Sequence, residues 1–255
     1  MNKLIKVTNS KYTDYEELID QRDTLLKEAM QNNVKFDQLF GDDMIKLFEL
    51  QIEAIKYKKL IRYCTQLENS NQPIIFSELQ EFINLSIQSY YDELEQIISD
   101  IDFAKEFTIS SPEETKAVKR IYFRIAKLIH PDRRPDLADD ETIKEFWNRT
   151  AFAYKLNDKK SLIELEVAIN KYLKDQNIDT ADIEIENIDQ KIHDLEIEIE
   201  HILNTEPYTY KYILEDEEKI KELKDDYQLK IKEYKVYIKE LKNEYSKFKI
   251  QGIYS

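Results

Sequence analysis

Residues that interrupt helices are scarce in this sequence, which has two glycines and five prolines among 255 residues. The phosphate-binding loops of nucleotide enzymes need clustered glycines, whereas Gly41 and Gly252 are isolated. A P-loop or doubly wound nucleotide-binding fold is therefore nearly excluded. Charged residues make up 35% and hydrophobic residues 42% of the chain, a composition typical of long helices and coiled coils. The sequence predicts an all-α protein.

Cysteine is almost absent as well, since Cys64 is the single one in the chain. One cysteine cannot form a disulfide framework or a zinc site built on cysteine pairs, and this usage fits a reducing, cytoplasmic setting. The N-terminal residues contain no apolar segment of signal-peptide length, and no apolar run approaches the roughly 18 residues of a membrane span. We therefore expect a cytoplasmic protein that binds no metal or other cofactor and does not enter a membrane.

Positive charge is in deficit overall, because 52 acidic residues outnumber 38 lysines and arginines and give a net charge of −14. Such a chain would be repelled by a phosphate backbone, so nucleic acid is not an expected partner. One segment, 112–134, reverses the balance with seven basic and three acidic residues. A basic surface in an acidic protein predicts a partner with an acidic surface. No polar, concave arrangement typical of an active site can be assembled from the sequence, so we expect no enzymatic activity.

Apolar periodicity divides the chain into three predicted regions, of which the first, 1–106, is a helical N-terminal region. Its helices are expected to begin near Asp14, near Gly41 and at Ser77, where Gln80 completes a capping-box pattern. The asparagine pair 32–33 is a breaker and predicts the end of the first of these helices. No motif in this region indicates a function.

The other two regions are 107–174, which carries the basic segment, and 175–255, which carries heptads. Isoleucine, leucine and tyrosine recur there at steps of three and four on both sides of Glu206-Pro207. Two heptad runs with one break between them predict an antiparallel coiled-coil hairpin. The same heptads are compatible with closing within one chain or with pairing between two chains in a homodimer.

The basic segment has the pattern of an amphipathic helix with a defined start and end. Ser111 and Glu114 form a capping box around Pro112. Pro131 ends the helix near His130, because proline lacks an N–H and disfavours helix at the residue before it. At about 100° per residue, apolar and basic side chains fall on opposite faces. The apolar face consists of Val118, Ile121, Tyr122, Ile125, Ala126, Leu128 and Ile129, and the basic face of Lys116, Lys119, Arg120, Arg124 and Lys127.

This stretch resembles the J domain of DnaJ-type co-chaperones over about residues 110–167. In that family a basic second helix, a His-Pro-Asp loop and a third helix form a finger that docks on DnaK-type chaperones. Here the tripeptide is His130-Pro131-Asp132, and the apolar and basic positions of the preceding helix match the family pattern. The next helix supplies Trp147 and the pair Ala153-Tyr154 where the family has an aromatic residue and Ala-Tyr. A Gly/Phe-rich linker and a Cys-x-x-Gly module are absent from the sequence.

The resemblance implies a non-enzymatic co-chaperone that docks on a DnaK-type chaperone and stimulates its ATPase. It implies that Asp132 accepts charge-assisted bonds from a partner arginine, that Pro131 fixes the turn and that His130 orients the loop. The helical flanks would then localise the protein or select a client. The residues expected to contact the chaperone are His130, Pro131, Asp132, Lys119, Arg120, Arg124, Lys127, Arg133 and Arg134.

A structural or scaffold protein is the alternative, in which the J-like helices serve only as packing elements. Ile121 and Leu128 widen the apolar face of the basic helix, and Phe123 interrupts its basic side. Flanking helices that covered these residues would also bury the docking face. The exposure of the basic residues and of the tripeptide therefore distinguishes the two hypotheses, and occlusion favours the scaffold.

Overall fold

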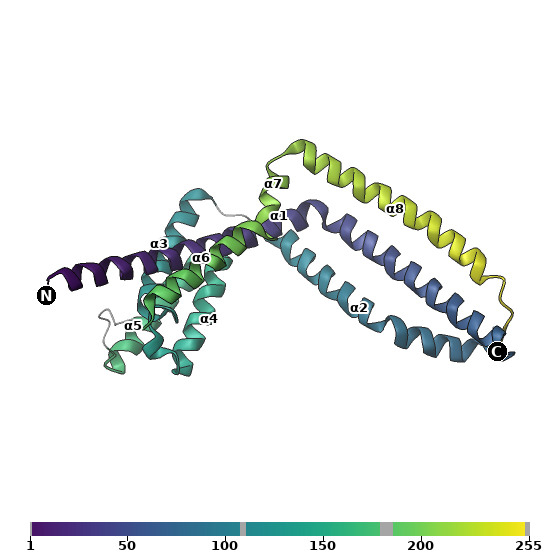
Figure 1. The fold of residues 1–255 in the computed structure, drawn as a ribbon, viewed down its shortest axis with the longest axis horizontal. Helices are drawn as coiled ribbons and strands as arrows, with labels where there is room; N and C mark the ends of the chain where they lie inside the picture. Colours follow the sequence, from purple (N-terminus) through teal and green to yellow (C-terminus); the bar gives the residue numbers. More distant parts are fainter. Residues whose placement is uncertain (1, 108–110, 179–185, 253–255) are drawn as a thin grey trace. The chain divides into compact units, whose positions relative to one another are not determined.

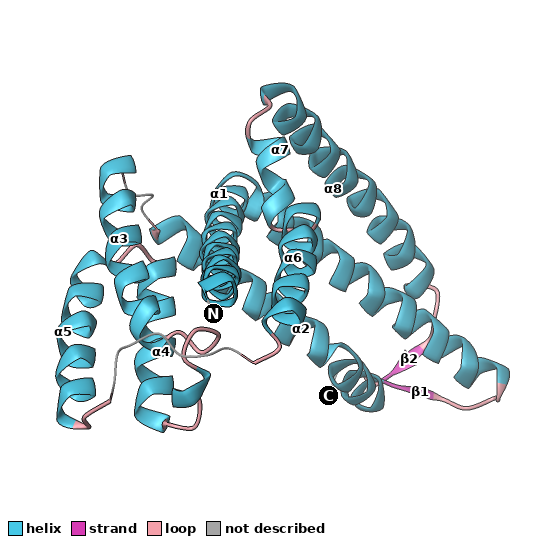
Figure 2. Ribbon diagram, turned by 60° about the vertical axis from the view of Figure 1, so that its left-hand side comes forward, coloured by secondary structure: helices cyan, strands magenta, loops and turns pink. Residues whose placement is uncertain are grey.

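The computed structural model describes residues 2–107, 111–178 and 186–252, which fold almost entirely into helices (Figures 1 and 2). The predicted all-α class is confirmed. Two short strands, β1 (Ile74–Ile75) and β2 (Ile250–Gln251), pair in parallel. The helices are α1 (Asn2–Asn69), α2 (Phe76–Glu106), α3 (Pro112–Ile129), α4 (Glu141–Lys155), α5 (Lys159–Asp175), α6 (Ile188–Asn204), α7 (Lys211–Leu214) and α8 (Glu217–Tyr245), with 3-10 turns η1 (Pro135–Leu137) and η2 (Tyr208–Tyr210).

The chain forms two compact units, and α1 contributes to both. Unit 1 contains Met1–Asn33 and Thr108–Lys211, and unit 2 contains Val34–Phe107 and Tyr212–Ser255. This division differs from the predicted regions 1–106, 107–174 and 175–255. The heptad stripes of α6 and α8, predicted to form the seam of a hairpin, pack instead on α1, each in its own unit.

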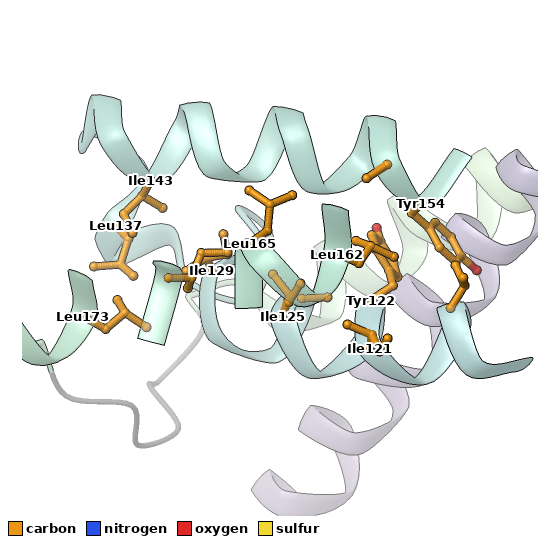
Figure 3. Close-up of a cluster of buried hydrophobic side chains, with 14 residues drawn as sticks. Ile121, Tyr122, Ile125, Ile129, Leu137, Ile143, Tyr154, Leu162, Leu165 and Leu173 are labelled. Carbon is orange, nitrogen blue, oxygen red and sulfur yellow. The ribbon is translucent and has the colours of Figure 1, made fainter. Parts of the chain in front are cut away.

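In unit 1, helices α3, α4 and α5 enclose a shared apolar core (Figure 3). The Tyr122 ring stacks on Tyr154 with centroids 3.8 Å apart, and the His130 ring meets Trp147 edge-on at 4.4 Å. Because the earlier residue of α3 meets the later residue of α4, the two helices are antiparallel. The buried core consists of Val118, Ile121, Tyr122, Ile125, Ala126, Ile129, Leu137, Ile143, Ala153, Tyr154, Leu162, Leu165, Ile169 and Leu173.

The first part of α1 packs against α6 in the same unit. Tyr15 and Ile19 are buried with Leu195, and a second cluster lies one to three turns further along the pair of helices. Burying these apolar stripes stabilises both helices, which carry charged residues on their other faces. The second cluster consists of Leu25, Ala29, Ile199, Ile202 and Tyr208.

In unit 2, the later part of α1 lies between α2 and α8 (Figure 1). On the α8 side, Leu50 and Ala54 are buried with Ile231, Ile238 and Leu241. On the α2 side, the end of α1 meets the start of α2 and the strand β1. The buried residues there are Leu60, Cys64, Ile74, Leu79, Ile83 and Ile87.

Helix α1 continues through residues 33–41, so the break predicted at the two asparagines is wrong. Phe36 and Phe40 are buried in this stretch, with ring centroids 4.6 Å apart. A Cβ atom on Gly41 would lie 2.6 Å from Cγ2 of Ile101. The glycine therefore allows α1 and α2 to approach closely inside a helix rather than opening a new one.

The two predicted capping boxes had different outcomes. At Ser111 the box is present, with the serine hydroxyl accepting from the amide of Glu114 and the Glu114 carboxylate accepting from the amide of Ser111. At Ser77 it is absent, because α2 begins one residue earlier and Ile75 is its N-cap. Pairing of β1 with β2 holds Ile75 in an extended conformation and thereby sets the start of α2.

Candidate functional site

The loop after α3 is folded tightly by its own backbone. Its first residue, His130, is extended, as expected before proline. The His130 carbonyl accepts from the amides of Arg133 at 2.9 Å and Arg134 at 2.8 Å. The amide of Asp132 donates to Nδ1 of His130 at 3.0 Å. The loop therefore holds Pro131 and the Asp132 carboxylate in a defined turn.

His130 is buried, with 1% of its surface exposed. One ring edge meets Trp147 of α4. Because Nδ1 accepts from an amide, the ring proton lies on Nε2, which faces Oδ2 of Asp23 at 3.5 Å. Nη2 of Arg22 lies 3.1 Å from the same Nε2. The histidine is thus enclosed between α4 and the first part of α1.

Asp132 is engaged by α1 through both its side chain and its backbone. Arg22 donates from Nη1 to the Asp132 carboxylate at 2.8 Å, and the Tyr15 hydroxyl donates to the Asp132 carbonyl at 3.2 Å. Arg22 also bonds Asp23 and lies 3.5 Å from the carboxylate of Glu198. Burial opposes its charge, but the charges of Asp23 and Asp132 outweigh that effect and raise the pKa of Arg22. A carboxylate and an arginine thus meet at the loop inside this chain.

The two arginines after the tripeptide are buried as well. Arg133 donates from Nη2 to the carboxylate of Asp20 and, at 2.9 Å, to the carbonyl of Glu16, so it is bound to α1. Burial raises the pKa of Asp20, and the Arg133 charge opposes that rise. Arg134 turns back into the loop, where it bonds the Asp136 carboxylate at 2.7 and 2.9 Å. Neither arginine is presented to solvent, although the resemblance implied that both contact a partner.

Asp23 connects the loop to α3. The Tyr122 hydroxyl donates to its Oδ2 at 2.7 Å in a buried position. Burial alone would raise the pKa of Asp23, but the hydrogen bond from His130 and the charge of Arg22 lower it. Burial and the Asp23 charge raise the pKa of Tyr122. Asp23 therefore stays ionised and accepts bonds from three different elements.

The basic face of α3 is more open than the loop. Arg120, Arg124 and Lys127 are exposed, and Lys119 is half-buried with its Nζ 5.5 Å from the centre of the Phe123 ring. Arg124 makes a two-pronged bond to Glu166 of α5 at 2.6 and 2.8 Å.

A cleft of about 570 Å³ separates this face from α1 and contains charges of both signs. Exposed Arg120 and Lys127 line it from α3, and Glu16, Glu17 and Asp20 line it from α1. Acidic side chains of α1 in the same chain thus face the basic side chains of α3 across this cleft.

A second cleft, of about 310 Å³, lies between the loop, α1 and α4. Lys27 lines it, donates to Oδ1 of Asn157 and sits 4.1 Å above the Tyr154 ring. Burial, followed by the charge of Lys119, lowers the pKa of Lys27 to about 8. Arg22, Asp23, His130 and Asp132 line the same cleft.

The contribution of α1 was not predicted from the sequence, although one signal was available. Tyr15, Ile19, Asp23 and Lys27 follow one another at steps of four and are all buried. Two charged residues thus continue an apolar stripe, and buried charges are paired or hydrogen-bonded when they persist. Such residues in phase with a stripe indicate polar partners on a neighbouring element.

Comparison with models of protein families found no matching family, and comparisons with curated proteins and with solved structures found no match either. Within the residues described, no group of three or more histidine, cysteine, aspartate or glutamate side chains is placed to hold a metal ion. Over the same residues, no helix combines the length and apolar character that crossing a membrane requires.

Proposed function

We propose that this chain is a J-domain co-chaperone that docks on a DnaK-type chaperone in the cytoplasm and stimulates its ATPase. The observation that carries the proposal is the arrangement of α3, loop and α4. A helix with an exposed basic face ends at a His-Pro-Asp turn and returns as an antiparallel helix packed through Tyr122, Tyr154 and Trp147. The chemistry would occur in the partner, and this chain would shift the partner's conformational equilibrium.

Part of the proposed docking surface is open in the structure. Pro131 is exposed, and the Asp132 side chain keeps 38% of its surface exposed. Beside Pro131 lies a largely apolar cleft of about 270 Å³ lined by Leu137, Ile143 and Trp147. Together with the exposed residues Arg120 and Lys127, these features offer a partner one apolar contact and one basic surface. The long flanks would localise the protein or bind a client.

The scaffold alternative also has an observation in its favour, because α1 covers the loop. His130, Arg133 and Arg134 are each exposed by 4% or less. A buried, hydrogen-bonded loop is what a purely structural role requires. In this alternative the tripeptide serves only to end α3 and to form the contact with α1.

The ATPase rate of purified DnaK-type chaperones, measured with and without the chain, separates the two functions. We expect stimulation, and we expect it to fall to the basal rate with His130→Gln, because the loop loses its orienting residue. Asp132→Asn is a second variant, chosen because its side chain is partly exposed and its replacement does not leave an empty core position. Both variants should also be made together with Arg22→Ala, which removes the arginine from the loop.

Circular dichroism and thermal unfolding show whether each variant keeps its helices, so that a lost activity is not confused with a lost fold. The co-chaperone function is supported if the wild-type chain or the Arg22→Ala variant stimulates the ATPase and the Asp132→Asn substitution abolishes that stimulation. Equal stimulation with and without the loop substitutions, or none by any folded form across a panel of DnaK-type chaperones, would leave the scaffold as the function.

A further inference from the structure

We infer that the first part of α1, residues 11–33, masks the docking loop and must leave it before a chaperone can bind. The inference rests on the proposed function and adds its regulation. Arg22 occupies the Asp132 carboxylate that a partner arginine would need, and Asp20 and Glu16 hold Arg133. In this conformation α1 is an internal competitor of the partner.

The first part of α1 carries charges opposite in sign to those of the loop and of the basic face of α3. Facing α3 and the loop, it presents Glu16, Glu17, Asp20 and Asp23 around a single arginine, Arg22. The carboxylates meet the positive side chains, and the arginine meets the one acidic residue of the tripeptide. This pattern of charge complementarity is the kind that selects a partner surface.

The contact between α1 and the loop is polar, which makes it separable. Among the residues described, the apolar core of α3, α4 and α5 includes no side chain from α1. The buried apolar side chains of α1 in this unit, Tyr15, Ile19, Leu25 and Ala29, cluster with α6 instead. Leu26 is 39% exposed and lines the cleft beside Tyr122 and Trp147. Separating α1 from the loop would therefore expose charged and hydrogen-bonding groups that water can solvate, while the α1–α6 contact stays buried.

Masking lowers the apparent affinity for the chaperone by the fraction of molecules whose loop is uncovered. A ligand or second protein could bind the α1–α6 pair only after the pair has left the loop. Its binding would raise the uncovered fraction, because a ligand shifts an equilibrium toward the form that it binds. The loop would then be available only in the presence of that second component.

The test compares Arg22→Ala with Arg62→Ala, which removes an exposed arginine from the same helix within unit 2. The first readout is the chain concentration giving half-maximal stimulation of the chaperone ATPase. We expect it to fall about tenfold with Arg22→Ala, as the masked state loses its charged anchor. Arg62→Ala should match the wild type. A further variant, Asp20→Ala, removes the contact to Arg133 and should act in the same direction as Arg22→Ala.

The second readout needs no chaperone. Trp147 is the single tryptophan of the chain and lines the same cleft as Arg22. Its fluorescence should become about twofold more sensitive to acrylamide in Arg22→Ala if the loop is uncovered. Circular dichroism confirms that each variant keeps its helices.

The outcomes separate this inference from the proposed function. Stimulation that is equal for wild type and Arg22→Ala, or weaker for Arg22→Ala, overturns masking while the co-chaperone function stands. An unchanged Trp147 in Arg22→Ala without stimulation by any form overturns masking as well. A Trp147 that becomes accessible in Arg22→Ala, with no stimulation by any form, overturns the proposed function and leaves α1 as the cover of a structural loop.

Discussion

Helix α1 is held by different chemistry along its length. Over residues 11–33 its contacts with α3, the loop and α4 are hydrogen bonds and ion pairs centred on Arg22, Asp23 and Lys27. Over residues 34–69 its buried contacts with α2 and α8 are mainly apolar and aromatic, with the solvent-accessible ion pairs Lys105–Asp42 and Lys242–Glu53 beside them. One continuous helix thus contacts the loop through charged groups and contacts α2 and α8 mainly through apolar groups.

The difference bears on which contact can be released. Apolar burial is lost in proportion to the area returned to water, at roughly 25 cal/mol per Å². Paired charges regain water when they separate, so their net contribution is small even where breaking one partner is costly. Salt and pH act on charges and leave hydrocarbon contacts largely unchanged. The polar contact of residues 11–33 with the loop is therefore suited to reversible release, whereas the apolar contacts of α1 with α6, α2 and α8 are suited to be permanent.

The largest effect is expected in the apolar stretch. Phe40 is 1% exposed and packs between Phe36 and Tyr227, with ring centroids 4.6 and 6.2 Å away. Phe40→Ala should lower the free energy of unfolding by about 3–5 kcal/mol, because it leaves a cavity. Urea denaturation followed by circular dichroism measures the loss, which should be nearly independent of salt.

A matched control for that substitution is Leu85→Ala, since Leu85 lies on α2 in the same unit and is 77% exposed. Its effect should stay within about 0.5 kcal/mol. A loss of that small size for Phe40→Ala, or a loss that changed strongly with salt, would contradict the apolar character assigned to this stretch.

Lys27 provides the next effect, which depends on pH. Its pKa is about 8 in the folded chain and near 10.5 when unfolded. Between these values the unfolded chain binds more protons, so the free energy of unfolding contributed by Lys27 rises with pH. From pH 7 to 9.5 the gain should be about 2 kcal/mol relative to Lys27→Met. Below about pH 7 the destabilisation is complete and constant.

The comparison ends at pH 9.5 because above pH 10 the ionisation of tyrosines lowers the free energy of unfolding. Tyr15 has a pKa raised to about 12 by burial and by the Asp132 charge, and it stays protonated when the unfolded chain ionises. Lys46→Met, at an exposed position of the same helix, serves as the control substitution. A difference between wild type and Lys27→Met that stayed flat from pH 7 to 9.5 would refute the lowered pKa.

The parts of the fold that were predicted correctly depend on local chemistry. The capping box at Ser111 and the stop at Pro131 fix the ends of α3 through contacts within a few residues. The face of α3 that is buried follows from its own periodicity, and Val118, Tyr122 and Ile125 are all buried. Such signals lie within one element, so a sequence contains them completely.

The missed parts depend on contacts between residues far apart in the chain. Inside α1, Gly41 packs closely against Ile101 of α2, and the loop is contacted by Arg22, more than 100 residues before Asp132. Asn32 and Gly41 resemble helix ends by their residue types, but tertiary packing overrides that preference. The buried charges in phase with the apolar stripe of α1 indicated polar partners, but nothing in the sequence indicated that α3 and the loop supply them.

The smallest expected effect shows that burial, rather than charge alone, makes the α1 contact matter. Lys11 pairs with Asp189 near the start of α6 at 2.7 Å, with side chains 42% and 73% exposed. Exposed pairs contribute about 0–1 kcal/mol, so Lys11→Ala should change the unfolding free energy by less than about 0.5 kcal/mol. Arg22, whose side chain is 13% exposed and touches three carboxylates, should cost more when removed, because it leaves Asp23 with fewer donors in a buried site. Urea denaturation followed by Trp147 fluorescence compares the unfolding free energies of both variants in unit 1. Equal losses would mean that the burial of Arg22 adds nothing to the strength of its contact with the loop.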